Sequence, residues 1–361
     1  MNKIHFNCQL PLLCVMLLLS ACQSAPVREV TPSAVISTQV RLLDERIEKL
    51  KMAAAELKNA NQYLCTNYNA DTLGIAQEKW RVLFTRWQGL QGINITLNEG
   101  VKLDGWLIQF WPDKKNLTAN KIDNLLANPK ATAETLQQLG KPANNIGAAE
   151  YFLFDEKLIS QSTLQNTEQC QGLLWLSDSL KIQIQQLAQQ YQQPNGVSAQ
   201  LLLMANQDAA QQHYAITQLF GVLDAQIDVS AKKISTIIVN NEQVQPLFAE
   251  AWRADYSLTA LRKQLSAIEE FYQGGRGGIG LDDLARQQGF KVHAEQFETR
   301  LKLAEHTLSQ ETDLQELMKD PIKTLDALQE SYVAITQSRD ALHQLAQDLN
   351  ITLSFNATDG D

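Results

Sequence analysis

Hydrophobic residues recur every three or four positions along most of this chain, with charged and polar residues between them. Such spacing places the apolar side chains on one face of a helix and predicts amphipathic α-helices. The clearest stretches are residues 40–57, 173–191, 209–227 and 325–349. Alternation typical of strands is confined to two short candidates, 93–97 and 351–355. The pattern therefore predicts an all-α protein.

A turn signal divides the helical pattern near its middle. Gln192-Gln-Pro-Asn-Gly-Val197 combines Pro, Asn and Gly between two long helical stretches. Each side has enough predicted helices for a bundle of its own. We therefore predict an N-terminal helical bundle over 38–192 and a C-terminal helical bundle over 197–361.

The first residues have the pattern of a bacterial secretion signal. Lys3 supplies a basic start, residues 10–19 are apolar, and Leu19-Ser-Ala-Cys22 resembles a lipoprotein cleavage site. We predict a signal peptide over 1–21, an acylated Cys22 that anchors the protein to a membrane, and a polar tether over 22–37. Gln23 after the cysteine is typical of sorting to the outer membrane of a Gram-negative cell. The alternative is an ordinary signal peptide with an incidental cysteine.

Cysteine usage agrees with an oxidising compartment. Cys8 and Cys14 fall within the signal peptide and Cys22 is acylated, so Cys65 and Cys170 remain. An even pair outside the cytoplasm predicts a disulfide, which closes a loop of roughly a hundred residues and contributes up to about 4–5 kcal/mol in the chain-entropy model. Two separate buried thiols remain an alternative, and a two-cysteine metal site lacks a nearby histidine.

Charge and motifs argue against several function classes. The net charge is −9 and no basic run occurs, which argues against nucleic acid as a partner. The sequence contains neither a Gly-x-Ser-x-Gly elbow nor a His-Glu-x-x-His zinc motif. The glycines of 274–280 follow a helical pattern, so they predict an interhelical loop and not a dinucleotide site. None of these motifs therefore identifies a catalytic residue.

Several segments, spread in order over nearly the whole chain, resemble the imelysin family. They are Glu78-Lys-Trp-Arg81 with Trp87, Phe110-Trp-Pro-Asp113, Ala251-Trp-Arg253, Tyr272-Gln-Gly-Gly275, Leu281-Asp-Asp-Leu284 and the C-terminal 355–361. The resemblance implies two helical bundles with a site in the cleft between them, in an iron-regulated protein of the cell envelope.

The family's signature, Gly-x-His-x-x-Glu before an apolar helix, is altered in this chain. Asn145-Ile-Gly-Ala-Ala-Glu150 has Glu150 in the Glu position, but Asn145 replaces the Gly and Gly147 replaces the His. Asn144 and Asn145 predict a helix start, with Glu150 in or just after its first turn. In the family pattern His and Glu share a helix face and could hold one metal ion; here Glu150 could bind a cation with distant carboxylates, or accept hydrogen bonds from Trp252 and Arg253 as a structural brace.

The sequence thus predicts a ligand or metal site built from Glu150, Gly147, Trp111, Trp252 and Arg253. The preferred interpretation is an envelope lipoprotein that assists iron acquisition without catalysis, and that binds iron or another divalent metal, an iron complex, or a protein partner in the envelope. The resemblance also carries a peptidase label, so a metallopeptidase is the first alternative. A structural scaffold is the second.

Overall fold

The computed structural model describes residues 29–93, 95, 97, 105–159, 167–308 and 313–353. The predicted signal peptide, Cys22 and the first part of the tether lie outside these residues. Nearly all regular structure in the described chain is helical, which confirms the predicted all-α class. Within the same residues, every helix is too short or too polar to span a membrane.

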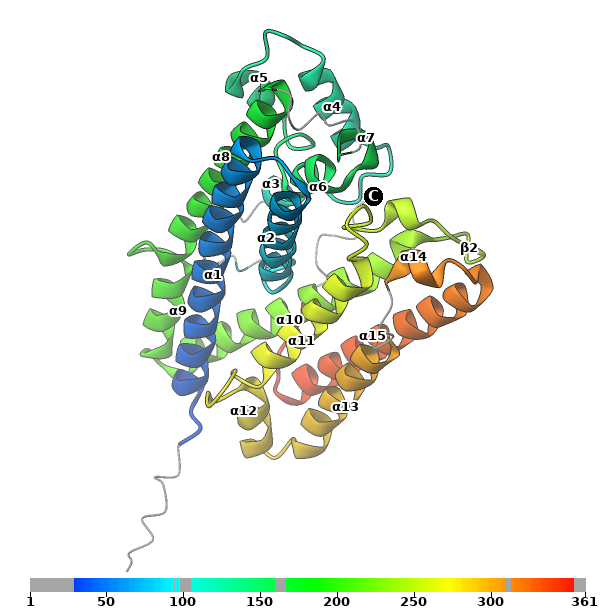
Figure 1. The fold of residues 1–361 in the computed structure, drawn as a ribbon. Coiled ribbons are helices and arrows are strands. Elements are labelled where there is room, and N and C mark those ends of the chain that lie inside the picture. Colours follow the sequence, from blue (N-terminus) through cyan, green and yellow to red (C-terminus); the bar gives the residue numbers. More distant parts are fainter. Residues whose placement is uncertain are drawn as a thin grey trace, which may run out of the picture.

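The helices of the first half begin with a long one and continue through short ones to a second long one. They are α1 (Pro32–Thr66), α2 (Ala70–Gln88), α3 (Gly105–Ile108), α4 (Leu117–Leu126), α5 (Ala133–Gln138), α6 (Ile146–Phe154), α7 (Glu156–Ile159), α8 (Thr167–Gln192) and α9 (Val197–Ala205). Helix α1 packs lengthwise against α2 and α8, and the short helices α4 to α7 gather at the upper end of α8 (Figure 1).

The second half forms another group of long helices, which runs across the direction of α1 (Figure 1). Its elements are α10 (Ala209–Ile237), β1 (Ile238–Val239), β2 (Gln243–Val244), the 3₁₀ helix η2 (Pro246–Phe248), α11 (Ser257–Tyr272), α12 (Leu281–Gln287), α13 (Lys291–Thr307), α14 (Leu314–Leu317) and α15 (Pro321–Asp348). Helix α15 packs against α10 and α13, and α11 against α10.

The two groups of helices share one hydrophobic core. Helix α1 contacts α10, and α2 contacts α11, so apolar side chains from both halves join in a single buried cluster. The predicted division into two domains therefore stays a prediction. The disulfide between Cys65 on α1 and Cys170 on α8 is present, with the two Cα atoms 5.5 Å apart, which confirms the predicted pairing.

Two boundaries differ from the sequence prediction. Helix α1 begins at Pro32, because Thr31 caps it and Val35 and Ile36 are fully buried, so residues 32–37 belong to the helix and not to the tether. The strand predicted at 351–355 is not formed over its described residues, 351–353. The paired strands are instead β1 and β2, which form a short antiparallel hairpin.

One aspartate, Asp113, fixes a helix start that borders the later site. Helix α4 lacks a cap from its own Asn116, and the Asp113 carboxylate accepts the backbone N–H groups of Leu117 and Thr118 at 2.7 and 2.8 Å. Each such cap satisfies donors that a helix start leaves free. The Phe110-Trp-Pro-Asp113 turn therefore sits at a fixed position before α4.

Candidate functional site

A cavity of about 250 Å³ brings the sequence-predicted residues together. Its walls come from α2, the segment between α3 and α4, α6, and the segment from η2 to the start of α11. The described residues that line it are Phe84, Gln109, Phe110, Trp111, Asp113, Lys114, Asn116, Thr118, Gly147, Glu150, Asp155, Leu247, Phe248, Ala249, Glu250, Ala251, Trp252 and Arg253. All five predicted ligand candidates are among them.

The signature segment forms the start of α6, as its asparagines predict. Asn145 is the N-cap, and its side-chain oxygen accepts the backbone N–H of Gly147 at 2.7 Å. Its amide group donates to the carbonyls of Lys141 and Pro142, so the capping side chain is held at both ends. A Cβ on Gly147 would lie 2.9 Å from that capping oxygen and would meet nothing else within 4 Å outside its own helix backbone and chain neighbours.

Glu150 points its carboxyl group from α6 toward the segment before α11. Its Oε1 accepts the backbone N–H groups of Arg253 at 2.7 Å and Ala254 at 3.0 Å. The expected hydrogen bond from Arg253 to Glu150 is therefore present. The expected hydrogen bond from Trp252 is not found, because the turn directs the backbone N–H of Ala254 to Glu150 instead. The contact joins segments about a hundred residues apart, so Glu150 does brace the two halves of the chain.

Burial determines the proton affinity of Glu150. The side chain is 4 % exposed, and this burial raises the pKa of the carboxyl to about 7. The Arg253 charge and the two backbone N–H groups oppose the rise, and the negative charge of Glu250 adds to it. At neutral pH both the protonated and the ionised form of Glu150 are therefore populated.

The turn that receives Glu150 has an uncommon backbone conformation. Ala251 and Asp255 have φ angles of 54° and 47°, in the left-handed region that residues with a Cβ seldom adopt. Between them, the N–H groups of Arg253 and Ala254 converge on one carboxylate oxygen. Strained backbone of this kind is often concentrated at functional sites.

The side chain of Arg253 is fixed by contacts on several sides. Its Nε donates to Asp155 at 2.9 Å and its Nη2 to Asn116 at 2.8 Å. Its guanidinium lies 4.2 Å from the ring centroid of Trp252 and 5.0 Å from that of Tyr151. Arg253 is thus neutralised by Asp155 and held between two aromatic faces.

A second buried carboxylate, Glu250, lines the same cavity. It is 4 % exposed and pairs with Lys233 of α10 at 2.5 Å, while Gln109 donates to it at 2.8 Å. Lys233 also contacts the side-chain oxygen of Gln88, and burial lowers the pKa of its ammonium. Glu250 is therefore engaged on both of its oxygens by groups of the protein.

Three tryptophans of the family-like segments support the site through their N–H groups. Trp80 donates to the carbonyl of Ile146 at 2.9 Å, which holds the start of α6. Trp87 donates to Gln109 at 2.7 Å, and Trp111 donates to the carbonyl of Phe248 at 3.0 Å. Trp111 and Trp252 line the cavity itself.

These residues do not fit a metal ion. Gly147 offers no ligand, one oxygen of Glu150 is occupied by two N–H groups, and Glu250 is neutralised by Lys233. In the described chain, no three side chains of His, Cys, Asp or Glu lie together as a metal-binding group. The predicted divalent-metal site at Glu150 thus has no ligand set among the described residues.

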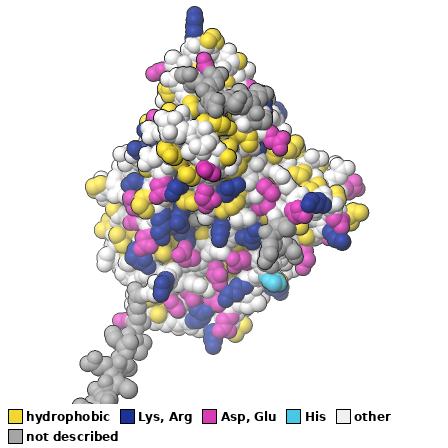
Figure 2. Space-filling view, viewed as in Figure 1, with side chains coloured by type: hydrophobic (Ala, Val, Ile, Leu, Met, Phe, Trp, Pro, Cys, Tyr) yellow, Lys and Arg dark blue, Asp and Glu magenta, His cyan; other side chains and the backbone are white. Residues whose placement is uncertain are grey.

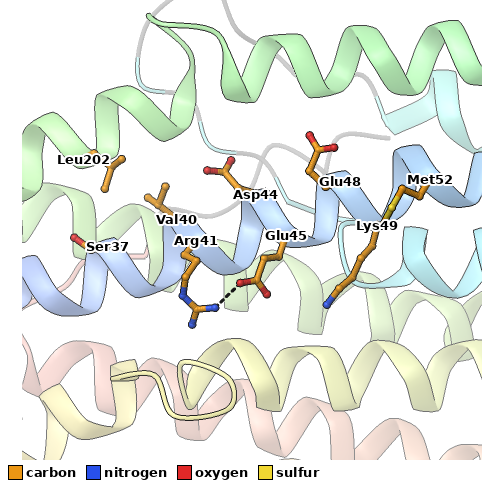
Figure 3. Close-up of a pocket in the computed structure, with 9 residues that line it drawn as sticks. All are labelled: Ser37, Val40, Arg41, Asp44, Glu45, Glu48, Lys49, Met52 and Leu202. Atoms are coloured by element: carbon orange, nitrogen blue, oxygen red, sulfur yellow. Dashed lines mark hydrogen bonds and ion pairs between the residues drawn. The ribbon is translucent and has the colours of Figure 1, made fainter.

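A larger groove of about 550 Å³ runs along α1 beside α9 (Figure 3). Arg41 and Glu45 in its wall form an ion pair at 2.5 Å, and Leu202 reaches in from α9. Its half-buried carboxyl, Asp44, accepts the Ser198 hydroxyl at 2.6 Å. The groove contains none of the residues that the signature or the tryptophan motifs single out, so the cavity at Glu150 is the better candidate.

Charged side chains of both signs are mixed on one face of the molecule. On the face shown in Figure 2, acidic and basic side chains are interspersed over the lower part of the molecule. A mixed surface of this kind lacks the single-sign stripe that nucleic-acid binding uses. The face shown in Figure 2 therefore gives no sign of a nucleic-acid-binding surface.

Sequence reasoning missed four residues of the site: Gln109, Asp155, Lys233 and Glu250. Three of them directly adjoin segments that it used, since Gln109 precedes Phe110-Trp111, Glu250 precedes Ala251-Trp252, and Asp155 follows the apolar run of α6. Lys233 gave no local signal, because it lies inside a long helical pattern. Its ion pair with Glu250 joins two distant segments and is found only in the folded structure.

Comparison with known proteins places the fold and the family. The described architecture is similar to that of a structure described as an iron-regulated protein A precursor from Parabacteroides distasonis ATCC 8503, with a TM-score of 0.69 and 13% identity over 90% of this chain and 97% of that one. It is also similar to an imelysin-like protein from Psychrobacter arcticum 273-4, with a TM-score of 0.68 and 17% identity over 91% and 99% of the two chains.

No curated protein sequence matches the chain. The family model described as Imelysin matches residues 45–350, which include the altered signature, both sides of the cavity and most of the helices. The match covers far more than half of the chain and agrees with the resemblance noted from the sequence. This protein is a member of the imelysin family.

Proposed function

We propose that this protein is a non-catalytic binding protein of the bacterial cell envelope that serves iron acquisition. In this proposal, the cavity around Glu150 holds a small organic ligand, either an iron complex or a compound that accompanies iron. The lipoprotein features of residues 1–22 support the envelope location. The similarity to a structure described as an iron-regulated protein supports the link to iron.

The observation that carries the proposal is the combination of a preformed cavity and an interior that lacks catalytic partners. Aromatic walls with a few fixed polar groups are typical of ligand sites. Among the described lining residues there is no Ser, Cys or His to act as a nucleophile or a general base. The two buried carboxylates do not form an acid–base pair, since Lys233 and Gln109 engage Glu250.

The size of the cavity favours a small ligand. Its volume of about 250 Å³ is below the ~300–1,000 Å³ that is usual for drug-sized ligands. A compact chelate or a short organic molecule fits this volume better than an extended peptide substrate does. Size and chemistry therefore both argue for binding of a small molecule over peptide hydrolysis.

Growth under iron limitation tests the proposed function. Cells that lack the protein should grow more slowly than wild type when iron is scarce and equally well when it is plentiful. The wild-type gene should restore growth, whereas Glu150→Ala should not, although the variant is still exported. Undiminished growth of the deletion strain in iron-poor medium would contradict the role in iron acquisition.

A peptidase assay tests the non-catalytic part separately. The purified protein should leave casein intact when zinc or iron is supplied. Cleavage that a chelator blocks, and that disappears in a folded Glu150→Gln variant, would replace the binding function with that of a metallopeptidase.

A further inference from the structure

Of the two fully buried carboxylates that line the cavity, only one has an ion pair among the described residues. Glu250 is neutralised by Lys233 at 2.5 Å, and Asp155 by Arg253 at 2.9 Å. Within the described residues, no ion pair joins Glu150 to a Lys, Arg or His side chain, and its Oε2 receives no hydrogen bond. The ionised form of this buried carboxylate is stabilised by the charge of Arg253, which is itself paired with Asp155, and by two backbone N–H groups on Oε1. Glu150 is therefore a buried carboxylate without an ion-pair partner of its own among the described residues.

The walls around this carboxylate are aromatic. They include Phe84, Phe110, Trp111, Phe248 and Trp252. The negative face of an aromatic ring attracts cations, and ammonium ligands are commonly recognised in this way. The protein's own cations already use such faces, since Arg253 lies over Trp252 and the Lys114 ammonium lies 5.8 Å from the Phe248 ring centroid at the rim.

We propose that the cavity around Glu150 binds a small organic cation, in which an ammonium group pairs with the Glu150 carboxylate while an apolar body packs against the aromatic walls. The proposal rests on the proposed function, because it names the class of ligand for the same cavity. The cation supplies the counter-charge and the hydrogen-bond donors that Oε2 of Glu150 lacks in the protein alone.

Other ligand classes fit the cavity less well. An organic anion would meet the carboxylates of Glu150 and Glu250, while Arg253 and Lys233 are already engaged by carboxylates. The lining cation without an ion pair among the described residues, Lys114, is exposed at the rim and lies near the Phe248 ring. A neutral alcohol could donate a hydrogen bond but would leave the charge of Glu150 uncompensated in a buried site, which is unfavourable. A bare metal ion lacks further ligands among the described residues.

Three probes with the same aromatic body and different charge test the proposal. They are benzylammonium, benzyl alcohol and benzoate, and their affinities are measured by titration calorimetry and by the fluorescence of the cavity tryptophans. We expect benzylammonium to bind on the order of tenfold more tightly than benzyl alcohol, because hydrogen bonds to charged groups are the stronger ones. Benzoate should bind more weakly than either.

Two variants identify the group responsible. Glu150→Gln removes the charge but keeps an oxygen that can accept both backbone N–H groups, so it should remain folded by near-UV circular dichroism. In this variant benzylammonium and benzyl alcohol should bind with roughly equal affinity, since no charged partner for the ammonium group remains. Glu48→Gln, on the separate groove of Figure 3, makes the same chemical change and should retain the full preference.

The possible outcomes separate this proposal from the proposed function. Tighter binding of benzoate, an unchanged preference in a folded Glu150→Gln variant, or no binding of any probe would each overturn the organic-cation proposal. None of these results bears on growth of the deletion strain in iron-poor medium, which tests the proposed function independently.

Discussion

The side-chain oxygen of Asn145 accepts the backbone N–H of Gly147 at 2.7 Å and occupies space within 2.9 Å of where a Cβ on residue 147 would lie. These are the two positions at which the chain departs from the family's Gly-x-His-x-x-Glu pattern. An asparagine cap and a side chain two residues later compete for the same space. The two replacements therefore belong together, because each one makes the other sterically favourable.

Gly147→His should destabilise the protein without creating a metal site. The new Cβ displaces the capping oxygen of Asn145, and loss of an N-cap typically costs about 0.5–2 kcal/mol. Urea unfolding measures this loss, and calorimetric titration with Zn²⁺ or Fe²⁺ measures metal affinity. Tight metal binding with unchanged stability would show that the wild-type site is a metal site that lacks only one ligand.

The matched control for this variant changes the competing residue. In an Asn145→Gly background the capping side chain is absent, and no other atom outside the helix backbone and chain neighbours lies within 4 Å of the Cβ position of residue 147. Adding Gly147→His to that background should cost less than about 0.5 kcal/mol, as for a substitution away from any packed feature. An equally large cost in both backgrounds would exclude the Asn145 contact as the cause.

Glu150→Gln should make the protein more stable than wild type at high pH and not at low pH. The pKa of the Glu150 carboxyl is about 7 in the folded protein, against 4.5 for an unperturbed glutamate. A raised pKa means that the folded state favours the protonated form. The stability it contributes is present below the unfolded pKa and is lost as the pH rises through the folded one.

Unfolding measured at a series of pH values checks this linkage. Between about pH 5 and pH 8, the difference in unfolding free energy between Glu150→Gln and wild type should rise in favour of the variant by about 2–3 kcal/mol. A difference that does not change with pH would show that Glu150 has an ordinary pKa and is not strongly desolvated.

Lys233→Met should be strongly destabilising, because it leaves Glu250 buried without its counter-charge. Breaking a buried ion pair on one side typically costs about 3–5 kcal/mol. The double variant Lys233→Met with Glu250→Gln should recover much of this loss, since the amide keeps an acceptor for Gln109. The four proteins form a double-mutant cycle, and additive effects would argue against a direct coupling of the two residues.

Cys22→Ser should release the protein from the membrane. If Cys22 carries the acyl chains, the variant loses both lipid labelling and membrane fractionation, because several chains on one residue give an anchor that does not readily dissociate. Labelling with a radioactive fatty acid and separation of membrane and soluble fractions provide the test. An unlabelled variant that stays in the membrane fraction would reject the lipoprotein anchor.

Much of the fold followed from local patterns in the sequence. Helical periodicity gave the all-α class, Asn145 marked the start of α6, and the two remaining cysteines gave the disulfide. The five predicted ligand candidates lie around one cavity because the family motifs adjoin it. Periodicity and capping signals depend on neighbours in the chain, so a single sequence contains them.

The interactions that determine the chemistry of the cavity could not be predicted from the sequence. The pairing of Lys233 with Glu250 and the two N–H groups that reach Glu150 join distant segments. The left-handed conformation of Ala251 has no local signal, because alanine seldom adopts it. The predicted tether, 22–37, extends too far, because α1 already begins at Pro32. Val35 and Ile36 are buried by contacts with distant parts of the chain, and the local sequence does not indicate such contacts.

The metal content of the purified protein tests the central claim most directly. The claim is that the cavity of this family member is a site for an organic ligand and not for a metal ion. After dialysis against excess Zn²⁺ or Fe²⁺ and removal of the free ion, elemental mass spectrometry should find well below one metal ion per chain, with no difference between wild type and Glu150→Ala. One metal ion per wild-type chain that is lost in a folded Glu150→Ala variant would contradict the account.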